Sequence, residues 1–102
     1  MSNLLETTFT FRNMDSTDAL REHALEKLTK LDKYLFKSGT AHVIFNMEGS
    51  SHVAEITLHI KGKSVIGIGS SNDMYASLDE AVDRLKKQMS REKERVKGHK
   101  GE

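Results

Sequence analysis

The side chains best suited to chemistry in this chain are basic, and they gather near its C-terminal end. From residue 84 onward the sequence holds eight Lys or Arg and three Asp or Glu, a balance of +5. Residues 1–83 hold eight Lys or Arg and twelve Asp or Glu, a balance of −4, so the net charge of +1 hides a polarised molecule. Four of the basic residues follow at intervals of three, four and four, which aligns them on one helix face: Arg84, Lys87, Arg91 and Arg95. Such a row can bind the phosphates of a nucleic-acid backbone.

Further basic residues flank this row. Lys86, Lys93 and Lys97 lie on a neighbouring stripe of the same segment. An earlier amphipathic segment adds four more, diluted by three acids: Arg21, Lys27, Lys30 and Lys33, among Glu22, Glu26 and Asp32. Carboxylates four residues away can neutralise the row only at its start, where Glu80 faces Arg84 and Asp83 faces Lys87. If the two helices lie side by side, two basic edges flank one groove.

The charge pattern alone leaves several functions open, because a basic helix face is also a common solvated surface. The chain could bind RNA through its phosphates, as a general double-stranded RNA binder or at one particular RNA. It could also be a protein-interaction module that docks an acidic partner. Base stacking is not expected, because the sequence has no Trp and its other aromatic residues are expected to pack. Phe9, Phe11 and Phe45 fall on apolar rows, and Tyr34, Phe36 and Tyr75 fall near helix ends.

Catalytic and metal-binding patterns are missing. There is no Cys, and the five His show no HExxH or other metal-ligand spacing. Gly67-Ile68-Gly69 resembles part of a phosphate loop, but Asn72 stands where the third glycine would be needed. We therefore expect a protein that is not an enzyme and has no cofactor, metal or small-molecule substrate. With no signal-peptide pattern and no apolar run of membrane-spanning length, we expect a cytoplasmic protein that does not contact the membrane.

Hydropathy patterns predict the elements that must position the basic residues. Alternating apolar residues predict strands over 5–12, 41–48, 54–61 and 64–70. Helical spacing predicts a first helix from about residue 18 to Gly39, and a last helix from Asp73 to about Lys97. The order β-α-β-β-β-α predicts an α+β fold, a four-stranded sheet with both helices packed on one face. We expect one domain over 1–97 and a short flexible tail over 98–102.

The same patterns predict the core. The apolar line of the first helix is Leu20, Ala24, Leu28, Leu31 and Leu35. The line of the last helix is Tyr75, Leu78, Val82, Leu85 and Met89, helped by Ala81. Gly67 and Gly69 share a face of the fourth strand, which would let a helix approach closely, so we expect that face to be the inner one. After Met89 the apolar face fades, so the last turns of the helix should project beyond the core.

Segments of three predicted elements carry a family likeness. They are, in the last helix, Asp73-Met74-Tyr75-Ala76-Ser77-Leu78-Asp79 and Arg84-Leu85-Lys86-Lys87-Gln88-Met89, in the first helix, Ala19-Leu20-Arg21-Glu22-His23 and Lys27-Leu28-Thr29-Lys30-Leu31, and in the third strand, Thr57-Leu58-His59-Ile60. Together they resemble the bacterial ribosome hibernation-promoting factor and ribosome-associated inhibitor family, which has a fold similar to double-stranded RNA-binding domains. The likeness covers about residues 4–97.

The resemblance implies binding to the small ribosomal subunit in the channel for mRNA and tRNA, which would block translation and stabilise idle ribosomes in stationary phase or stress. It places the rRNA-binding positions on Arg21, Lys27, Lys30, Arg84, Lys87 and Arg91, with Lys86 at a less regular position and Arg95 extending the row. The sequence ends at Glu102 without an acidic tail and resembles the short type, in which ribosome dimerisation needs a separate ribosome modulation factor. The resemblance leaves open whether ribosome dimers or idle single ribosomes are favoured.

Overall fold

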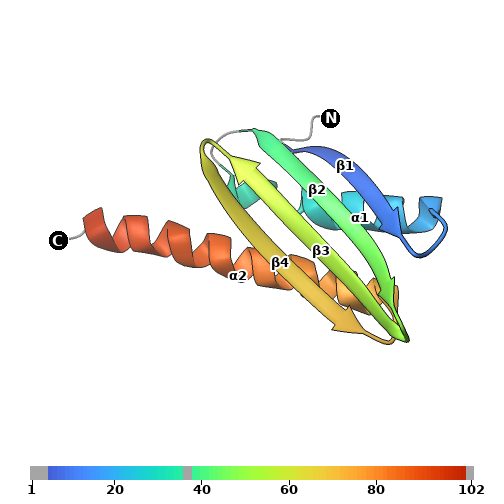
Figure 1. Ribbon diagram of the computed structural model, residues 1–102. Coiled ribbons are helices and arrows are strands. Elements are labelled where there is room, and N and C mark those ends of the chain that lie inside the picture. The colour runs from blue at the N-terminus through green and yellow to red at the C-terminus, as the bar shows by residue number, and fades with distance from the viewer. Residues whose placement is uncertain (1–4, 36–37, 101–102) are drawn as a thin grey trace.

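The computed structural model describes residues 5–35 and 38–100, with the backbone alone for residues 92–100. The elements follow in the order β1 Leu5–Arg12, α1 Asp18–Thr29, a 3-10 turn η1 Asp32–Tyr34, β2 Gly39–Glu48, β3 Ser51–Ile60, β4 Lys63–Ser71 and α2 Met74–Lys100 (Figure 1). The predicted α+β order β-α-β-β-β-α is confirmed, and η1 is an addition to it.

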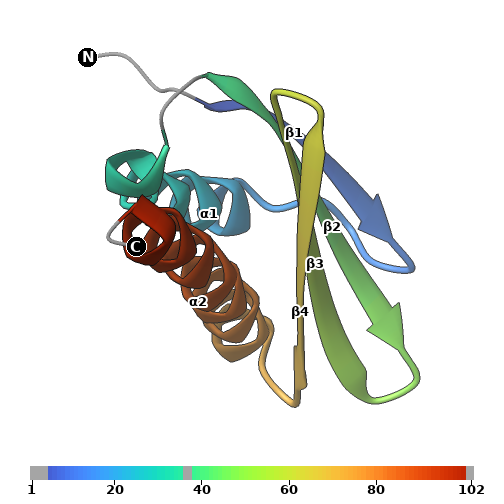
Figure 2. The same cartoon turned by 90° about the vertical axis from the view of Figure 1, so that its left-hand side faces the viewer.

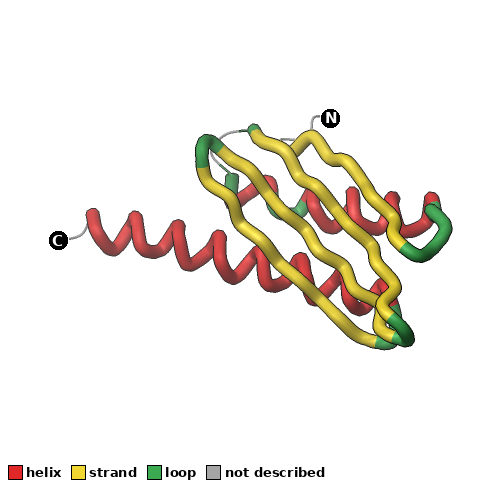
Figure 3. The backbone as a smooth tube through the Cα atoms, viewed as in Figure 1, coloured by secondary structure: helices red, strands yellow, loops and turns green. Residues whose placement is uncertain are grey.

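The four strands form one mixed sheet in the order β1-β2-β3-β4. The β1–β2 pair is parallel, and the β2–β3 and β3–β4 pairs are antiparallel. Both helices lie on the same side of the sheet, and no helix covers the other side in the part of the chain that the structure describes (Figure 2). The tube view shows α2 crossing behind the strands and continuing past the edge of the sheet (Figure 3).

The core lies between the sheet and the helices. Val43 and Phe45 of β2 point inward and lie opposite Ile56 and Ala54 of β3, and all four are completely buried. The ring of Phe45 also stacks with that of Phe11 in β1, at a centroid distance of 5.1 Å. Strict alternation along each strand therefore buries one face of the sheet, as the sequence predicts.

Two glycines of β4 bring α2 close to the sheet. Gly67 and Gly69 are buried on the inner face of the strand. A Cβ atom at Gly67 would run into the carbonyl oxygen of Ala81, and one at Gly69 into that of Ser77. The expectation that this glycine row faces a helix is confirmed, and the close approach fixes the path of α2 along β4.

The first helix ends earlier than predicted. α1 stops at Thr29, where the Thr29 hydroxyl donates to the Leu25 carbonyl at 2.8 Å. The backbone then tightens, because the Leu31 N–H bonds to the Leu28 carbonyl at 2.9 Å, a bond between residues three apart. Leu31 still enters the core and is completely buried. The apolar spacing of the sequence was therefore right about the core and wrong about a continuous helix up to Gly39.

The start of α2 also differs from the prediction. Tyr75, which the sequence places on the apolar line, is 39% exposed, whereas Met74 is buried. Ser77 is completely buried, and its hydroxyl donates to the His52 carbonyl at 2.6 Å. In the first turn of α2 the buried positions are therefore Met74 and Ser77 rather than Tyr75, and from Leu78 onward the predicted apolar line is buried. At the other end, α2 runs through Lys100, and the side chains of Lys93, Arg95, Val96 and Lys97 lie outside the described ones, as does Phe36.

Candidate nucleic-acid interface

The two helices that carry the predicted basic residues lie side by side. On the inner face of the sheet, α1 lies against the β1 side and α2 against β3 and β4 (Figures 1 and 2). A cluster of polar side chains joins them, with Asp79 of α2 at its centre. Oδ1 of Asp79 lies 3.0 Å from Nε2 of His23 and 3.6 Å from Nζ of Lys27. Lys27, a predicted RNA contact, therefore already has a carboxylate partner in the structure.

Arg84 is bound to the edge of the sheet. Its guanidinium donates to the Ile68 carbonyl of β4 at 2.9 Å and pairs with Glu80 at 2.8 Å. Two neighbours on the same face of α2 bind the same edge, since Glu80 accepts from the Ser70 N–H at 3.1 Å and Gln88 donates to the Ile66 carbonyl at 2.8 Å. β4 is an outer strand of the sheet. These three side chains therefore satisfy backbone groups that an outer strand leaves unpaired.

Two more of the predicted contacts have local acidic partners. Nζ of Lys87 lies 3.3 Å from Asp83, four residues earlier on α2, as the spacing predicts. Arg21 pairs with Asp18 at 2.8 Å, and its guanidinium lies 5.3 Å from the centroid of the Phe11 ring. These pairs are largely exposed to solvent, where such interactions contribute only about 0.2–1 kcal/mol each. A phosphate could therefore replace either carboxylate at small cost.

Three predicted contacts have no carboxylate partner among the side chains that the structure describes: Lys30, Lys86 and Arg91. Lys30 follows the last residue of α1 and is exposed, as is Arg91 on α2, whereas Lys86 is half-buried. The side chain of Arg95 lies outside the described ones. A cation without an internal partner has no carboxylate to give up when it binds a phosphate.

An open groove lies between η1 and α2. It has a volume of about 360 Å³ and is lined by Tyr34, Asp83, Lys86, Lys87, Ser90 and Arg91. Three cations and one carboxylate leave the lining positively charged. Basic residues of α2 therefore line a hollow beside η1. Its opposite wall is Tyr34, however, and none of the basic residues predicted on the first helix lines it.

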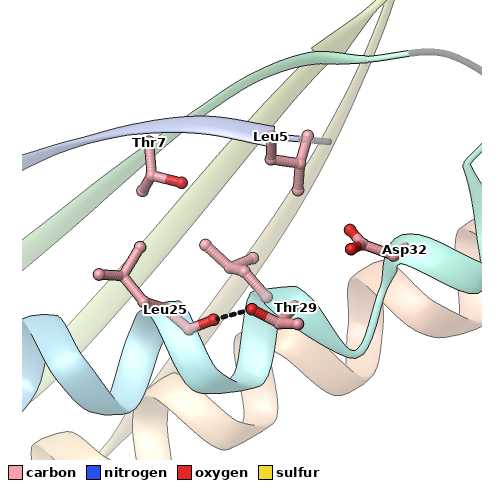
Figure 4. A pocket seen from close by; sticks show the side chains of 6 residues that line it. Leu5, Thr7, Leu25, Thr29 and Asp32 are labelled. Atoms are coloured by element: carbon pink, nitrogen blue, oxygen red, sulfur yellow. Dashed lines mark hydrogen bonds between the residues drawn. The ribbon is translucent and has the colours of Figure 1, made fainter. Parts of the chain in front are cut away.

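Two further features of the described residues, a histidine cluster and a small cavity, do not form a competing site. His42 of β2 bonds to the hydroxyls of Thr8 and Thr10 on the uncovered sheet face, at 2.6 and 3.1 Å. Among the described residues, no three His, Asp or Glu lie close enough together to hold a metal ion. A cavity between β1 and α1 has a volume of only about 10 Å³, room for about one water molecule. Figure 4 shows Thr7, Leu25 and Asp32 around it. Within the described chain, no helix is both long and apolar enough to cross a membrane.

Sequence reasoning missed Tyr34, Ser90 and Gln88. The sequence predicts a packing role for Tyr34 because it lies near a helix end, and the side chain does pack against the core; its place in the groove lining is the part that the sequence does not predict. The signal for Gln88 was present, since it follows Glu80 and Arg84 at helical spacing, but nothing in the sequence showed that this face of α2 borders an outer strand. Ser90 carries no charge and therefore did not enter a search for cations.

Comparison with known proteins identifies the family. Residues 7–97 match the family model described as Sigma 54 modulation protein / S30EA ribosomal protein. The chain is 32% identical to the ribosome hibernation promoting factor of Salmonella typhimurium over 95 residues, 93% of this chain and all of that protein. It is 31% identical to the factor of the same name from Azotobacter vinelandii over 91 residues, 89% of this chain and 85% of that one.

Solved structures share the fold. The N-terminal domain of Protein Y from Thermus thermophilus superposes with a TM-score of 0.76 at 34% identity, covering 89% of this chain and 98% of that one. A ribosomal subunit interface protein from Coxiella burnetii gives a TM-score of 0.75 at 23% identity, covering 85% of this chain and 96% of that one, and supports the fold alone.

Proposed function

The chain belongs to the Sigma 54 modulation protein / S30EA ribosomal protein family, and on this basis we propose that it is a ribosome hibernation factor. It binds the small ribosomal subunit in the channel for mRNA and tRNA, blocks translation and stabilises idle ribosomes in stationary phase or stress. Its relatives are named ribosome hibernation promoting factors. The observation that carries the proposal is the groove of α2, where Lys86 and Arg91 have no carboxylate partner among the described side chains.

The proposed contacts differ in what binding requires of them. Lys30, Lys86 and Arg91 can bind rRNA phosphates directly. Three others must first exchange a carboxylate partner for the phosphate: Arg21, Lys27 and Lys87. The free-energy cost of this exchange is small because these pairs are partly exposed. Arg95 extends the same row along α2 and stays a predicted contact. Arg84 is already bound to the Ile68 carbonyl and to Glu80, so we assign it mainly to holding α2 against β4.

The proposal also covers location and partners. A protein that acts on ribosomes works in the cytoplasm, and none of the steps above needs a cofactor or catalysis. Recognition of rRNA through its phosphates makes the affinity strongly dependent on salt. For each phosphate contact, the logarithm of the affinity falls by roughly 0.7–0.9 per unit rise in the logarithm of the salt concentration. The resemblance to the short type also makes a separate ribosome modulation factor a proposed partner, which acts on the same ribosome where ribosomes dimerise.

Sedimentation of ribosomes at graded salt tests the proposal. The wild-type protein should sediment with small subunits at low salt and be released as salt rises. The double variant Lys86→Gln/Arg91→Gln should bind more weakly, with a salt slope smaller by roughly 1.4–1.8. The matched control is Arg12→Gln/Lys61→Gln, which removes the same charge at the end of β1 and in the β3–β4 turn and should keep the wild-type slope.

The outcome against the proposal is wild-type protein found only in the ribosome-free fraction at low salt. Equal affinity for isolated duplex RNA in competition would indicate a general double-stranded RNA binder. A partner that stays bound after RNase treatment would indicate a protein-interaction module instead.

A further inference from the structure

The groove between η1 and α2 combines positive charge with an aromatic wall. Of its three cations, Lys87 is paired with Asp83 at 3.3 Å, whereas Lys86 and Arg91 have no carboxylate partner among the described side chains. Ser90 adds a hydroxyl between them. The groove can therefore take an anion at one wall, and Tyr34 forms the other.

Tyr34 is held in place and keeps part of its ring accessible. Its backbone N–H bonds to the Leu31 carbonyl at 2.9 Å, and Leu31 is completely buried, so η1 is fixed to the core. The Tyr34 side chain is only half-buried. Nζ of the exposed Lys33 lies 5.4 Å from the ring centroid, over the ring. A ring face that accepts the ammonium group of an exposed lysine can also accept a flat group that displaces it.

The groove's dimensions and chemistry together suit one nucleotide with a free base. Its volume of about 360 Å³ falls in the roughly 300–1,000 Å³ range of small-ligand sites. A duplex keeps its bases stacked inside and offers only phosphates and sugars to such a surface, whereas unpaired bases stack on aromatic side chains. A duplex would use Lys86 and Arg91 and leave Tyr34 without a role.

We propose that this groove binds an unpaired nucleotide of an RNA strand, with its base on the Tyr34 ring and its phosphate at Lys86 and Arg91. The inference rests on the proposed function for the presence of RNA and adds the conformation of that RNA. It departs from the sequence expectation that only shape and backbone are recognised, and it assigns a binding role to a residue that sequence reasoning placed in the packing.

Fluorescence anisotropy with two labelled probes tests this: a 12-nucleotide oligouridylate and a 12-base-pair RNA duplex, both at low salt. The proteins are the wild type, Tyr34→Leu, which keeps apolar volume against the core, and Tyr34→Phe, which keeps the ring. We expect Tyr34→Leu to weaken binding of the single strand by roughly 5- to 150-fold, the range for losing one base stack. Its duplex binding should not change, and Tyr34→Phe should match the wild type on both probes.

Three outcomes would overturn the inference. Tyr34→Leu could bind the single strand as well as the wild type does. Tyr34→Phe could fail as badly as Tyr34→Leu, which would assign the role to the hydroxyl. A polyglutamate peptide could compete as well as the single strand, which would indicate a general acid-binding surface. Thermal unfolding of each variant confirms that it is folded.

Pelleting with isolated small subunits separates this inference from the proposed function. Wild-type protein that does not pellet but still prefers the single strand through Tyr34 would contradict the function and leave the nucleotide groove standing. Wild-type protein that pellets normally, with oligouridylate binding that ignores Tyr34, would contradict the groove and leave the function standing.

Discussion

Charge reversal at Arg84 should destabilise the protein itself, whatever it does to RNA binding. Among the predicted RNA contacts whose side chains the structure describes, Arg84 is the one whose guanidinium bonds to a backbone group of the sheet, the Ile68 carbonyl. Together with Glu80 and Gln88 it covers the outer edge of β4. The variant Arg84→Glu removes this hydrogen bond and places a second carboxylate one helical turn from Glu80.

The size of the effect follows from three contributions. The lost hydrogen bond costs about 1 kcal/mol, at the lower end for a charged donor because the Arg84 side chain is 56% exposed. The lost ion pair with Glu80 costs about 0.3–0.5 kcal/mol, the usual value for an exposed pair four residues apart on a helix. The new repulsion between Glu80 and the introduced carboxylate costs a similar amount. The free energy of unfolding should therefore fall by about 2 kcal/mol.

Urea unfolding followed by circular dichroism measures this loss. The matched control is Lys86→Glu, the same charge reversal on the same helix at a side chain with no carboxylate partner among those described. That control should lose only about 0.2–0.5 kcal/mol, because the introduced carboxylate lies three residues from Asp83 on the same helix. The variant Arg84→Met keeps the apolar stem, avoids the new repulsion and should lose about 1.5 kcal/mol.

Equal free energies of unfolding for Arg84→Glu and Lys86→Glu would refute the reasoning, because the edge contact would then contribute nothing to stability. If the predicted difference is found, weak ribosome binding by Arg84→Glu cannot by itself identify Arg84 as an rRNA contact. The binding comparison must then use Lys86 and Arg91, whose removal should leave the fold unchanged.

Two further substitutions test the packing of α2 and the junction between the helices. Gly69→Ala should lower the free energy of unfolding by about 3 kcal/mol, because the added Cβ meets the backbone of Ser77. Its control is Gly62→Ala, where the added Cβ meets open space and only the positive φ of +81° is unfavourable. That control should lose only about 1 kcal/mol in the same urea titration. Asp79→Asn should cost about 0.5–1 kcal/mol by losing its ion pair with Lys27 and weakening its contact with His23. Because this substitution frees Lys27, it should also tighten ribosome binding. The dependence of log affinity on log salt, measured by sedimentation, should become steeper by roughly 0.7–0.9. An unchanged salt dependence would contradict a role for Lys27.

The sheet could be predicted from the sequence because its signal is local. Alternating apolar residues gave the four strands, and the tight turn at Lys61 and Gly62 is confirmed by their φ angles of 48° and 81°. The end of the first helix could not be predicted in the same way. Leu28, Leu31 and Leu35 keep helical spacing, and the same spacing also fits a helix that tightens into a 3-10 turn, since each leucine still reaches the core.

The interface could be predicted only as far as contacts within one helix. The pairs Glu80–Arg84 and Asp83–Lys87 follow from a spacing of four residues, and both are present. The bonds from Arg84 to β4 and from Lys27 to Asp79 join separate elements, so they depend on how α2 is rotated and how far it slides along the sheet. Gly67 and Gly69 fix both. The sequence showed that a helix would pack there without showing which side chains would meet the edge.

Internal pairing, more than total charge, decides which basic residues can contribute most to RNA binding. A lysine already paired with a carboxylate gains only the difference between that partner and a phosphate, and it leaves the carboxylate near the new anion. Lys27 and Lys87 are in this position, paired with Asp79 and Asp83. Lys30, Lys86 and Arg91 gain the full interaction, and the last two of these line the groove. The binding strength of this surface should therefore concentrate at the groove beside Tyr34 rather than spread evenly along the basic row.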